Sequence, residues 1–342
     1  MCVRKKHSGR NGAGESRLGK WLLVAVLVYL LVTIVLGVIW SSEPDVFSVR
    51  DHTRTVAADM QREPVTGFAT TVTMIRIAET LLDKPGGYIS NDILPPGLWM
   101  DNMPSWEFGA LVQLRDLSRA MRKDISRSQS QSAEDPDLTV AEPQFHFDST
   151  SWMLPSTEAE YRRGIKALYR YLDRLSDPAR PDAQFFARAD NLNHWLADLE
   201  TRLGSLSRVL GESVGKSGIP STSDLVGDED PLSQSVTADK VKTPWTQLDN
   251  VFYEARGTAW AALHIFRAIE VDFRKVLQDK NALASVRQVI IELEGSQGAM
   301  WSPVILNGSG FGLMANHSLT MAAYLSRANA AVSDLRALLS RG

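Results

Sequence analysis

The sequence has little of what would mark a disulfide-rich or a nucleic-acid-binding protein. It contains a single cysteine, Cys2, so no disulfide can form within the chain. Its 37 Lys and Arg residues are outnumbered by 40 Asp and Glu residues, and the formal net charge is −3. A nucleic-acid-binding surface typically shows a basic excess, so we expect no nucleic-acid partner. The composition, with 44% hydrophobic residues, excludes a collagen, a disordered chain and a polytopic transporter.

Sequence motifs of metal and phosphate binding are also scarce. The histidines form no His-Glu-x-x-His motif, and one cysteine cannot form a Cys-x-x-Cys pair. The glycine-rich run at residues 308–312 lacks the Lys-Ser/Thr pair of a phosphate-binding P-loop. We therefore expect no cofactor and no metal site. The sequence favours a protein without enzymatic activity and leaves an enzyme open.

One long stretch has no charged residue at all. Residues Trp21–Trp40 read WLLVAVLVYLLVTIVLGVIW, and at ~1.5 Å per residue they form a helix of ~30 Å, the thickness of the hydrocarbon core of a bilayer. Trp21 and Trp40 mark its two ends and Tyr29 lies between them, and aromatic rings favour the membrane interface. The stretch therefore predicts a transmembrane anchor over residues 21–40, with the lipid bilayer as its partner.

A buried core helix and a cleaved signal peptide are the alternatives for this stretch. The apolar region of a signal peptide has about 7 to 15 residues and ends at a small-x-small cleavage site. Here the uncharged run is longer, and bulky residues stand three positions before cleavage at either Ser41 or Ser42. The sequence therefore favours an uncleaved anchor.

Charge is divided unevenly on the two sides of the anchor. The first 42 residues hold six basic residues and Glu15, for +5, so the remaining 300 residues carry −8 of the total −3. By the positive-inside rule, the basic tail of residues 1–20 stays in the cytoplasm and everything after Trp40 is translocated. The exported body is then acidic and free of cysteine.

The body has the apolar periodicity of helices and no alternating strand pattern. We predict an all-α fold, in which the transmembrane helix is followed by an elongated antiparallel helical bundle with long irregular loops. The predicted body helices are 66–83, 105–128, 157–175, 185–210, a single helix of more than 30 residues from 243, then 281–294 and 318–339.

Three further expectations concern a helix cap, a pair of neighbouring helices and the domain organisation. Thr157 and Glu160 match a capping box at the start of one helix. The short proline-rich connection predicts that helices 157–175 and 185–210 are antiparallel neighbours. The domain organisation that follows is a periplasmic helical region over 41–210, a flexible acidic linker over 211–242, and a second helical region over 243–342 that packs on the first.

The candidate site residues gather in and beside three irregular stretches, 84–104, 138–156 and 295–317. These candidates are Trp99, Asp101, Trp106, Glu107, His146, Asp148, Trp152, Trp301 and His317. Aromatic rings with a few acidic groups form sugar, lipid or peptide sites, but tryptophans in loops also seal the ends of bundles. His146 and Asp148 are placed on one side of an extended segment, but no companion ligand accompanies them.

Several of these segments are similar to one known family. The strings LLDKPGGYISND (81–92), PPGLWMDNMPSWEFGALVQLRDLSRAMRKD (95–124), AEPQFHFD (141–148) and WSPVILNGSGFGLMANHSL (301–319) carry the resemblance. The family is a proteobacterial inner-membrane family known as domain of unknown function 2333, and the resemblance covers nearly all of residues 40–340. It implies a single-pass inner-membrane anchor, a cytoplasmic N-terminus and a periplasmic helical body. It implies no activity and no catalytic residues.

Two hypotheses for function follow. The first is a membrane-anchored periplasmic scaffold or interaction protein of the bacterial envelope, whose partner is another envelope protein or a second copy of the chain. The alternative is a protein that binds or hydrolyses envelope glycans or lipids at the aromatic loops.

Overall fold

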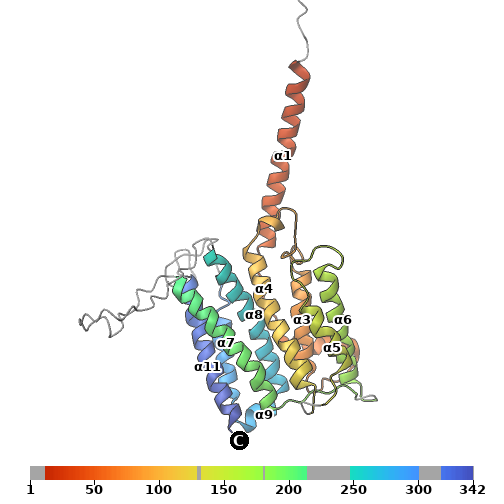
Figure 1. The fold of residues 1–342 in the computed structure, drawn as a ribbon, viewed down its shortest axis with the longest axis vertical. Coiled ribbons are helices and arrows are strands. Elements are labelled where there is room, and N and C mark those ends of the chain that lie inside the picture. The colour runs from red at the N-terminus through yellow and green to blue at the C-terminus, as the bar shows by residue number, and fades with distance from the viewer. Residues whose placement is uncertain (1–11, 129–131, 180–181, 214–246, 300–316, 342) are drawn as a thin grey trace, which may run out of the picture.

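A computed structural model describes residues 12–128, 132–179, 182–213, 247–299 and 317–341. All regular secondary structure in these ranges is helical, which confirms the predicted all-α fold. The first helix, α1, projects from one end of a body formed by the others (Figure 1). The body helices are α2 (Val49–Met60), α3 (Phe68–Asp83), α4 (Asn102–Ala120), α5 (Pro136–Phe145), α6 (Thr157–Ser176), α7 (Ala189–Ser213), α8 (Leu248–Asp272), α9 (Arg274–Asp279), α10 (Leu283–Gly295) and α11 (His317–Ser340).

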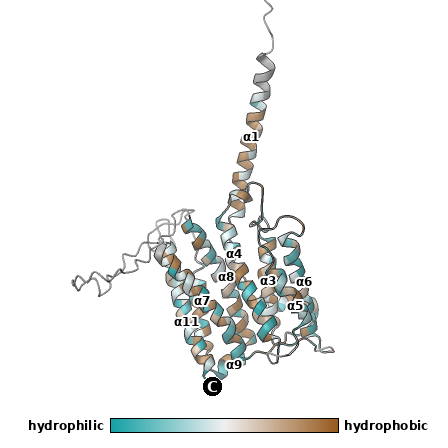
Figure 2. Cartoon of the chain, in the orientation of Figure 1, coloured by the Kyte–Doolittle hydropathy of each residue, from teal (hydrophilic) through white to brown (hydrophobic). Residues whose placement is uncertain are grey.

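Helix α1 (Gly12–Trp40) carries the uncharged run and makes few contacts with the body. Within the described residues, Gly19–Trp40 is the one stretch long and apolar enough to cross a membrane, and only 6% of its most apolar window is buried. Figure 2 shows that the hydrophobic part of this helix lies clear of the body. An apolar helix that is not covered by protein needs another apolar environment, and a bilayer supplies one.

Helix α8 lies at the centre of the body. Every residue from Ala255 to Phe266 is buried, so this helix has no face toward solvent over three turns. It packs against α3, α4 and α10, and more lightly against α7 and α11. One continuous hydrophobic core contains residues from all of these helices.

Helices α4 and α8 cross in close contact at two glycines. Both helices begin at the end of the body from which α1 projects (Figure 1). A Cβ atom on Gly257 would lie 2.0 Å from the carbonyl oxygen of Trp106, and one on Gly109 would lie 2.1 Å from the carbonyl oxygen of Glu254. Only glycine permits the two backbones to approach this closely.

The structure corrects the prediction of a single helix of more than 30 residues from residue 243. This helix is not continuous, because α8 ends at Asp272 and the short helix α9 begins after Phe273. At this break the Asp272 carboxylate accepts hydrogen bonds from the backbone and side chain of Thr70, both at 2.7 Å, and so caps the start of α3. The predicted start of the long helix, at residues 243–246, lies outside the described residues.

The predicted pairing of α6 with α7 is also wrong. Helix α6 packs mainly against α5 and α3, whereas α7 packs mainly against α11. The connection between α6 and α7 crosses the far end of the body, where the Phe186 amide donates to the carbonyl oxygen of Ile125 at 2.7 Å. The connection therefore carries α7 away from α6 to the other side of α4.

Two local predictions need correction as well. The N-cap of α6 is Ser156 and not Thr157, because the Ser156 hydroxyl accepts from the Ala159 amide at 3.4 Å. The predicted irregular stretch 138–156 contains most of α5, which begins with Asp135 as N-cap and Pro136 in the first turn. An N-cap aspartate followed by proline is a known start signal for a helix.

Candidate functional site

The end of the body nearest to α1 brings most of the notable polar and aromatic residues together. Two loops reach it: the first loop (residues 84–101) between α3 and α4, and the second loop (residues 146–156) between α5 and α6, which starts farther away, where His146 contacts Arg119 in the last turn of α4. The segment that follows α1 also starts there. This part of the molecule is called the α1-proximal end.

The segment after α1 runs along the buried central helix. Glu43 pairs with Arg256, the Asp45 carbonyl accepts from the Trp260 indole at 3.2 Å, and the Phe47 amide donates to His264 at 3.0 Å. Two residues of extended chain cover about 6.6 Å, and four residues of helix cover about 6 Å. Residues two apart in the extended segment (43, 45 and 47) therefore lie opposite residues four apart on α8 (256, 260 and 264). One side of the segment follows one face of the helix.

Arg256 joins three parts of the chain inside the body. Its side chain is 5% exposed, and its Nε donates to both carboxylate oxygens of Glu43 at 2.8 and 2.9 Å. Its Nη1 donates to the carbonyl oxygens of Ser296 and Gly298, both at 3.1 Å, just after α10. Charge-assisted hydrogen bonds of this kind are stronger than neutral ones, so Arg256 ties the α1 connection and the end of α10 to the core.

His264 is a buried neutral histidine. Its Nδ1 lies 2.7 Å from the carbonyl oxygen of Trp260, which can only accept, so Nδ1 carries the proton. Its Nε2 then accepts from the Phe47 amide, and the Phe47 ring stacks on the imidazole with the ring centroids 3.8 Å apart. Burial lowers the pKa of His264 to about 3, and the nearby Arg267 acts in the same direction.

This depressed pKa makes stability depend on pH. An unfolded histidine titrates near its ordinary pKa of 6.5, whereas folded His264 stays neutral down to about pH 3. Below pH 6.5 the unfolded state therefore binds a proton that the folded state does not, and we expect about 1.4 kcal/mol of stability to be lost per pH unit from this group. Denaturant unfolding in mild detergent between pH 7 and 5 measures this slope.

The control for this prediction is the variant His264→Asn. The pKa values of His52 and His317 are also lowered by burial, and both residues remain in the variant. The variant should therefore keep a shallower decline in stability toward pH 5. An identical slope in both proteins would contradict the assignment to His264.

Glu107 is a fully buried carboxylate that organises the first loop. Its Oε1 accepts from the Ile89 amide and its Oε2 from the Ser90 amide, both at 2.8 Å. The Ser90 hydroxyl and the ammonium group of Lys84 also contact it closely. Because every one of these partners belongs to residues 84–90, Glu107 holds the first loop against the start of α4.

The two loops of the α1-proximal end are joined by Asn91. Its side-chain amide donates to the carbonyl oxygen of Ser151 at 2.9 Å and to Glu158 at 3.0 Å. The Thr157 hydroxyl adds a hydrogen bond of 2.7 Å to the carbonyl oxygen of Asp148. The first and second irregular stretches predicted from the sequence therefore form one structural unit.

A small cavity lies where the two loops meet α4 and α8. Its volume is about 260 Å³, and its polar lining includes Tyr88, Ser90, Thr150 and Glu254. Burial raises the pKa of Glu254, and Arg202 partly offsets that effect. The cavity is small and offers one carboxylate that is not already engaged by the first loop.

The sequence-predicted site residues separate into an exposed and a buried group. Trp99, Asp101, His146, Asp148 and Trp152 are exposed on the two loops, whereas Trp106, Glu107 and His317 are completely buried. Trp301 lies outside the described residues. The buried three are part of the core: the Trp106 ring packs on Trp260 at 5.1 Å, and the His317 ring meets Phe252 at 5.9 Å.

His146 and Asp148 do not point to a shared ligand. His146 follows the last residue of α5 in a helical conformation, not in the extended segment that the sequence suggested. Its ring contacts the Glu142 carbonyl at 2.9 Å and Arg119 at 3.3 Å. Asp148 accepts from Thr150, and these hydrogen bonds lower its pKa. No group of three metal-ligating side chains occurs among the described residues.

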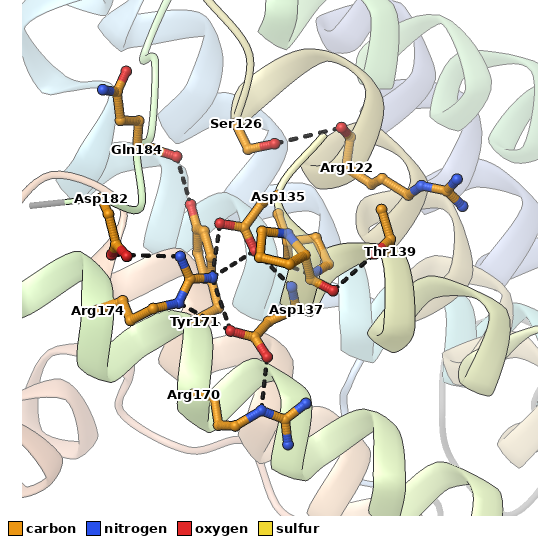
Figure 3. A network of polar contacts seen from close by, with 12 residues as sticks. Arg122, Ser126, Asp135, Asp137, Thr139, Arg170, Tyr171, Arg174, Asp182 and Gln184 are labelled. Atoms are coloured by element: carbon orange, nitrogen blue, oxygen red, sulfur yellow. Dashed lines mark hydrogen bonds and ion pairs between the residues drawn. The ribbon is translucent and has the colours of Figure 1, made fainter. Parts of the chain in front are cut away.

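A second polar network, shown in Figure 3, lies around the last turn of α6, at the end of that helix away from α1. Arg174 at the end of α6 pairs with Asp135 at 2.7 Å and with Asp137 at 2.8 Å, and Arg170 pairs with Asp137 at 2.7 Å. The Tyr171 hydroxyl donates to the carbonyl oxygen of Gln184 at 2.8 Å. The charges compensate each other, and the network fastens α5 and the connection to α7 onto α6.

Sequence reasoning missed the pair Glu43–Arg256. A signal for it was present, because Arg256 is the only charged residue between Glu254 and Arg267 in a helix that is otherwise almost wholly apolar. A charge in such a position needs a buried partner. The sequence could not name that partner, since 213 positions separate the two residues.

Comparison with known proteins links the chain to a protein family. No curated protein and no solved structure matches the chain. A family model does match, and it covers residues 15–342, which include α1 and the whole body. The chain belongs to the family described as an uncharacterized protein conserved in bacteria, DUF2333, as its loop segments predict.

Proposed function

We propose that this protein is a membrane-anchored helical scaffold of the bacterial envelope, in which α1 spans the inner membrane and the body binds another envelope protein or a second copy of the chain. The single observation that carries the proposal is the fixed connection between α1 and the core. Glu43, Asp45 and Phe47 bind Arg256, Trp260 and His264, so the body is held directly beside the end of the apolar helix.

The proposed orientation rests on charge. The basic tail before α1 favours the cytoplasm, and the body carries the net negative charge. The body would then lie in the periplasm. An acidic body without cysteine suits that oxidising compartment because it offers no thiol to oxidise.

Retention of α1 in the mature protein is supported by its contacts. A Cβ atom on Gly86 would lie 2.7 Å from the ring of Trp40, so the first loop is shaped to accommodate the last residue of α1. A removable signal peptide has no need of such a fitted contact.

A membrane-impermeant, amine-reactive cross-linker applied to intact spheroplasts tests this proposal. We expect Lys123 and Lys275 in the body to react, and Lys5, Lys6 and Lys20 in the tail to react only after permeabilisation. Mass spectrometry should recover residues 1–40 with the mature chain and links from the body to a reproducible second polypeptide.

Two outcomes of this experiment would count against the proposal. Modified tail lysines in intact spheroplasts would contradict the orientation. Links confined to one chain, with no partner and no second copy, would contradict the scaffold role even if the orientation is correct.

The glycan- or lipid-binding alternative draws support from the cavity between the loops. Ligand pockets usually measure about 300–1,000 Å³, so a cavity of about 260 Å³ is small for a sugar. Glycoside hydrolysis also needs a pair of carboxylates, and Glu107 is already engaged by Lys84 and Ser90. The geometry of the aromatic loops therefore supports this alternative less well than it supports a fixed connection between α1 and the body.

A further inference from the structure

The two loops of the α1-proximal end expose large apolar side chains to an unusual degree. Six of these side chains are more than half exposed, namely Leu94, Leu98, Trp99, Trp152, Met153 and Leu154. Leu154 is 98% exposed. Single exposed apolar residues are normal in soluble proteins, but a group of this kind on one face marks an interaction surface.

The two sets of exposed side chains are held on a common support. Asn91 links the first loop to the second through Ser151, and Glu107 fixes residues 89 and 90 to α4. Figure 1 shows that α6, which follows the second loop, starts on the side of the body from which α1 projects. Both loops therefore present their apolar residues near the membrane anchor.

One face of α1 is covered near its end. Thr33 is buried, and Leu36, Gly37 and Trp40 are partly buried, whereas their neighbours are exposed. Positions 33, 36, 37 and 40 form a single stripe on a helix. A Cβ atom on Gly37 would lie 3.6 Å from the Cβ of Pro96, which places the first loop directly against this face.

The position of this contact along α1 determines its depth in a bilayer. Gly19–Trp40 has 22 residues, or about 33 Å, and so just spans a hydrocarbon core of about 30 Å. Trp40 then lies at the boundary between the core and the headgroups, and Gly37 lies about 4.5 Å deeper. Pro96 and its neighbours Leu94 and Leu98 must therefore lie at the level of the lipid interface.

The charge of the loops determines what kind of membrane contact they can make. Residues 85–114 and 147–161 contain no Lys or Arg, and the first loop contributes Asp92 and Asp101. Attraction to anionic headgroups needs basic residues. Insertion of apolar and aromatic side chains into the interface does not, and Trp and Leu are well suited to it.

We infer that the two loops form a second membrane-contacting surface, which inserts Leu94, Leu98, Trp99, Trp152 and Leu154 into the interfacial region of the bilayer that α1 spans. The body is then seated on the membrane and not suspended from a single helix. This inference rests on the proposed role of α1 as a membrane anchor. The occupant of the surface is the lipid of the leaflet that faces the body.

Site-directed spin labelling of the full chain in phosphatidylcholine nanodiscs tests this inference. In a Cys2→Ser background, single labels are placed by Leu98→Cys and Leu154→Cys on the loops. The matched controls are Val28→Cys within α1 and Val140→Cys on α5, which is an exposed apolar position away from the loops. All four native side chains are exposed, so the substitutions should not disturb folding.

The measured quantity is the ratio of collision rates with oxygen and with a water-soluble nickel complex. We expect the ratios at positions 98 and 154 to be several-fold higher than at position 140 and to approach the value at position 28. High ionic strength should leave them unchanged, because no basic residue takes part.

The possible failures can be told apart. If position 28 is lipid-exposed while positions 98 and 154 are accessible to nickel, the loop surface is refuted and the anchor stands. If both reagents are excluded from 98 and 154, protein covers the loops and the inference is equally overturned. If position 28 itself is accessible to nickel, the proposed anchor fails first.

Discussion

The variant Glu107→Gln is expected to lose about 3–5 kcal/mol of stability toward unfolding. Glu107 and Lys84 are both almost completely inaccessible to solvent and pair with each other. The substitution keeps the size and shape of the side chain but removes its charge. The Lys84 ammonium group is then left buried without its counter-charge, and that desolvation is the main cost. Denaturant unfolding of the detergent-solubilised protein measures the loss.

Two companion variants separate charge pairing from general disturbance. Asp83→Asn breaks the neighbouring exposed pair with Arg162, at 3.0 Å, and should change stability by less than about 1 kcal/mol. The double variant Lys84→Met/Glu107→Gln removes both charges and should recover part of the loss. A loss for Glu107→Gln no larger than for Asp83→Asn would disprove the role assigned to the buried pair.

The variant Gly257→Ala should destabilise the protein by about 3 kcal/mol, through a single added methyl group. That methyl group would lie 2.0 Å from the carbonyl oxygen of Trp106, which belongs to the backbone of α4 and cannot rotate away. The two central helices must therefore move apart, and the contacts around Trp106 and Trp260 loosen. Tryptophan emission should shift to longer wavelength in the folded state, because both indole rings are buried.

Gly211→Ala is the matched control for this effect. It makes the same chemical change within helix α7, where a Cβ atom would have no neighbour within 4 Å. Alanine favours a helix over glycine by up to about 1 kcal/mol, so this variant should be neutral or slightly more stable. Equal losses for both variants would show that the crossing of α4 and α8 is not the cause.

The structural features that could be predicted from the sequence are those determined by residues close together in the chain. The length and lack of charge of Trp21–Trp40 suffice to predict a helix long and apolar enough to span a membrane, because both can be read from one local stretch of the sequence. The heptad-like leucines of α7 likewise identify its buried face, and Leu192, Leu196, Leu199 and Leu203 are indeed buried. A periodic pattern predicts which face of a helix is buried, but it does not identify the element that packs against that face.

The features that could not be predicted depend on pairs of residues far apart in the chain. Lys84 and Glu107 belong to different elements, and so do Gly109 and Gly257. Trp106 and Glu107 stood out as site candidates because they adjoin a loop rich in aromatics. Their burial follows from the approach of α8, which local sequence does not reveal. Membership of the family was predictable because long loop strings are specific even when their structural role is not.

The contact between Glu43–Phe47 and α8 also determines when the first body residues can reach their folded contacts during synthesis. If α1 is inserted as proposed, this segment leaves the membrane soon afterwards, yet its partners Arg256 and His264 lie more than 200 residues later. Synthesis at about 5–20 residues per second delays them by tens of seconds at the slower rate. In the proposed orientation, the first exported residues therefore acquire their final partners on α8 only late in translation, and until then the body cannot be fixed to the end of α1 through this segment.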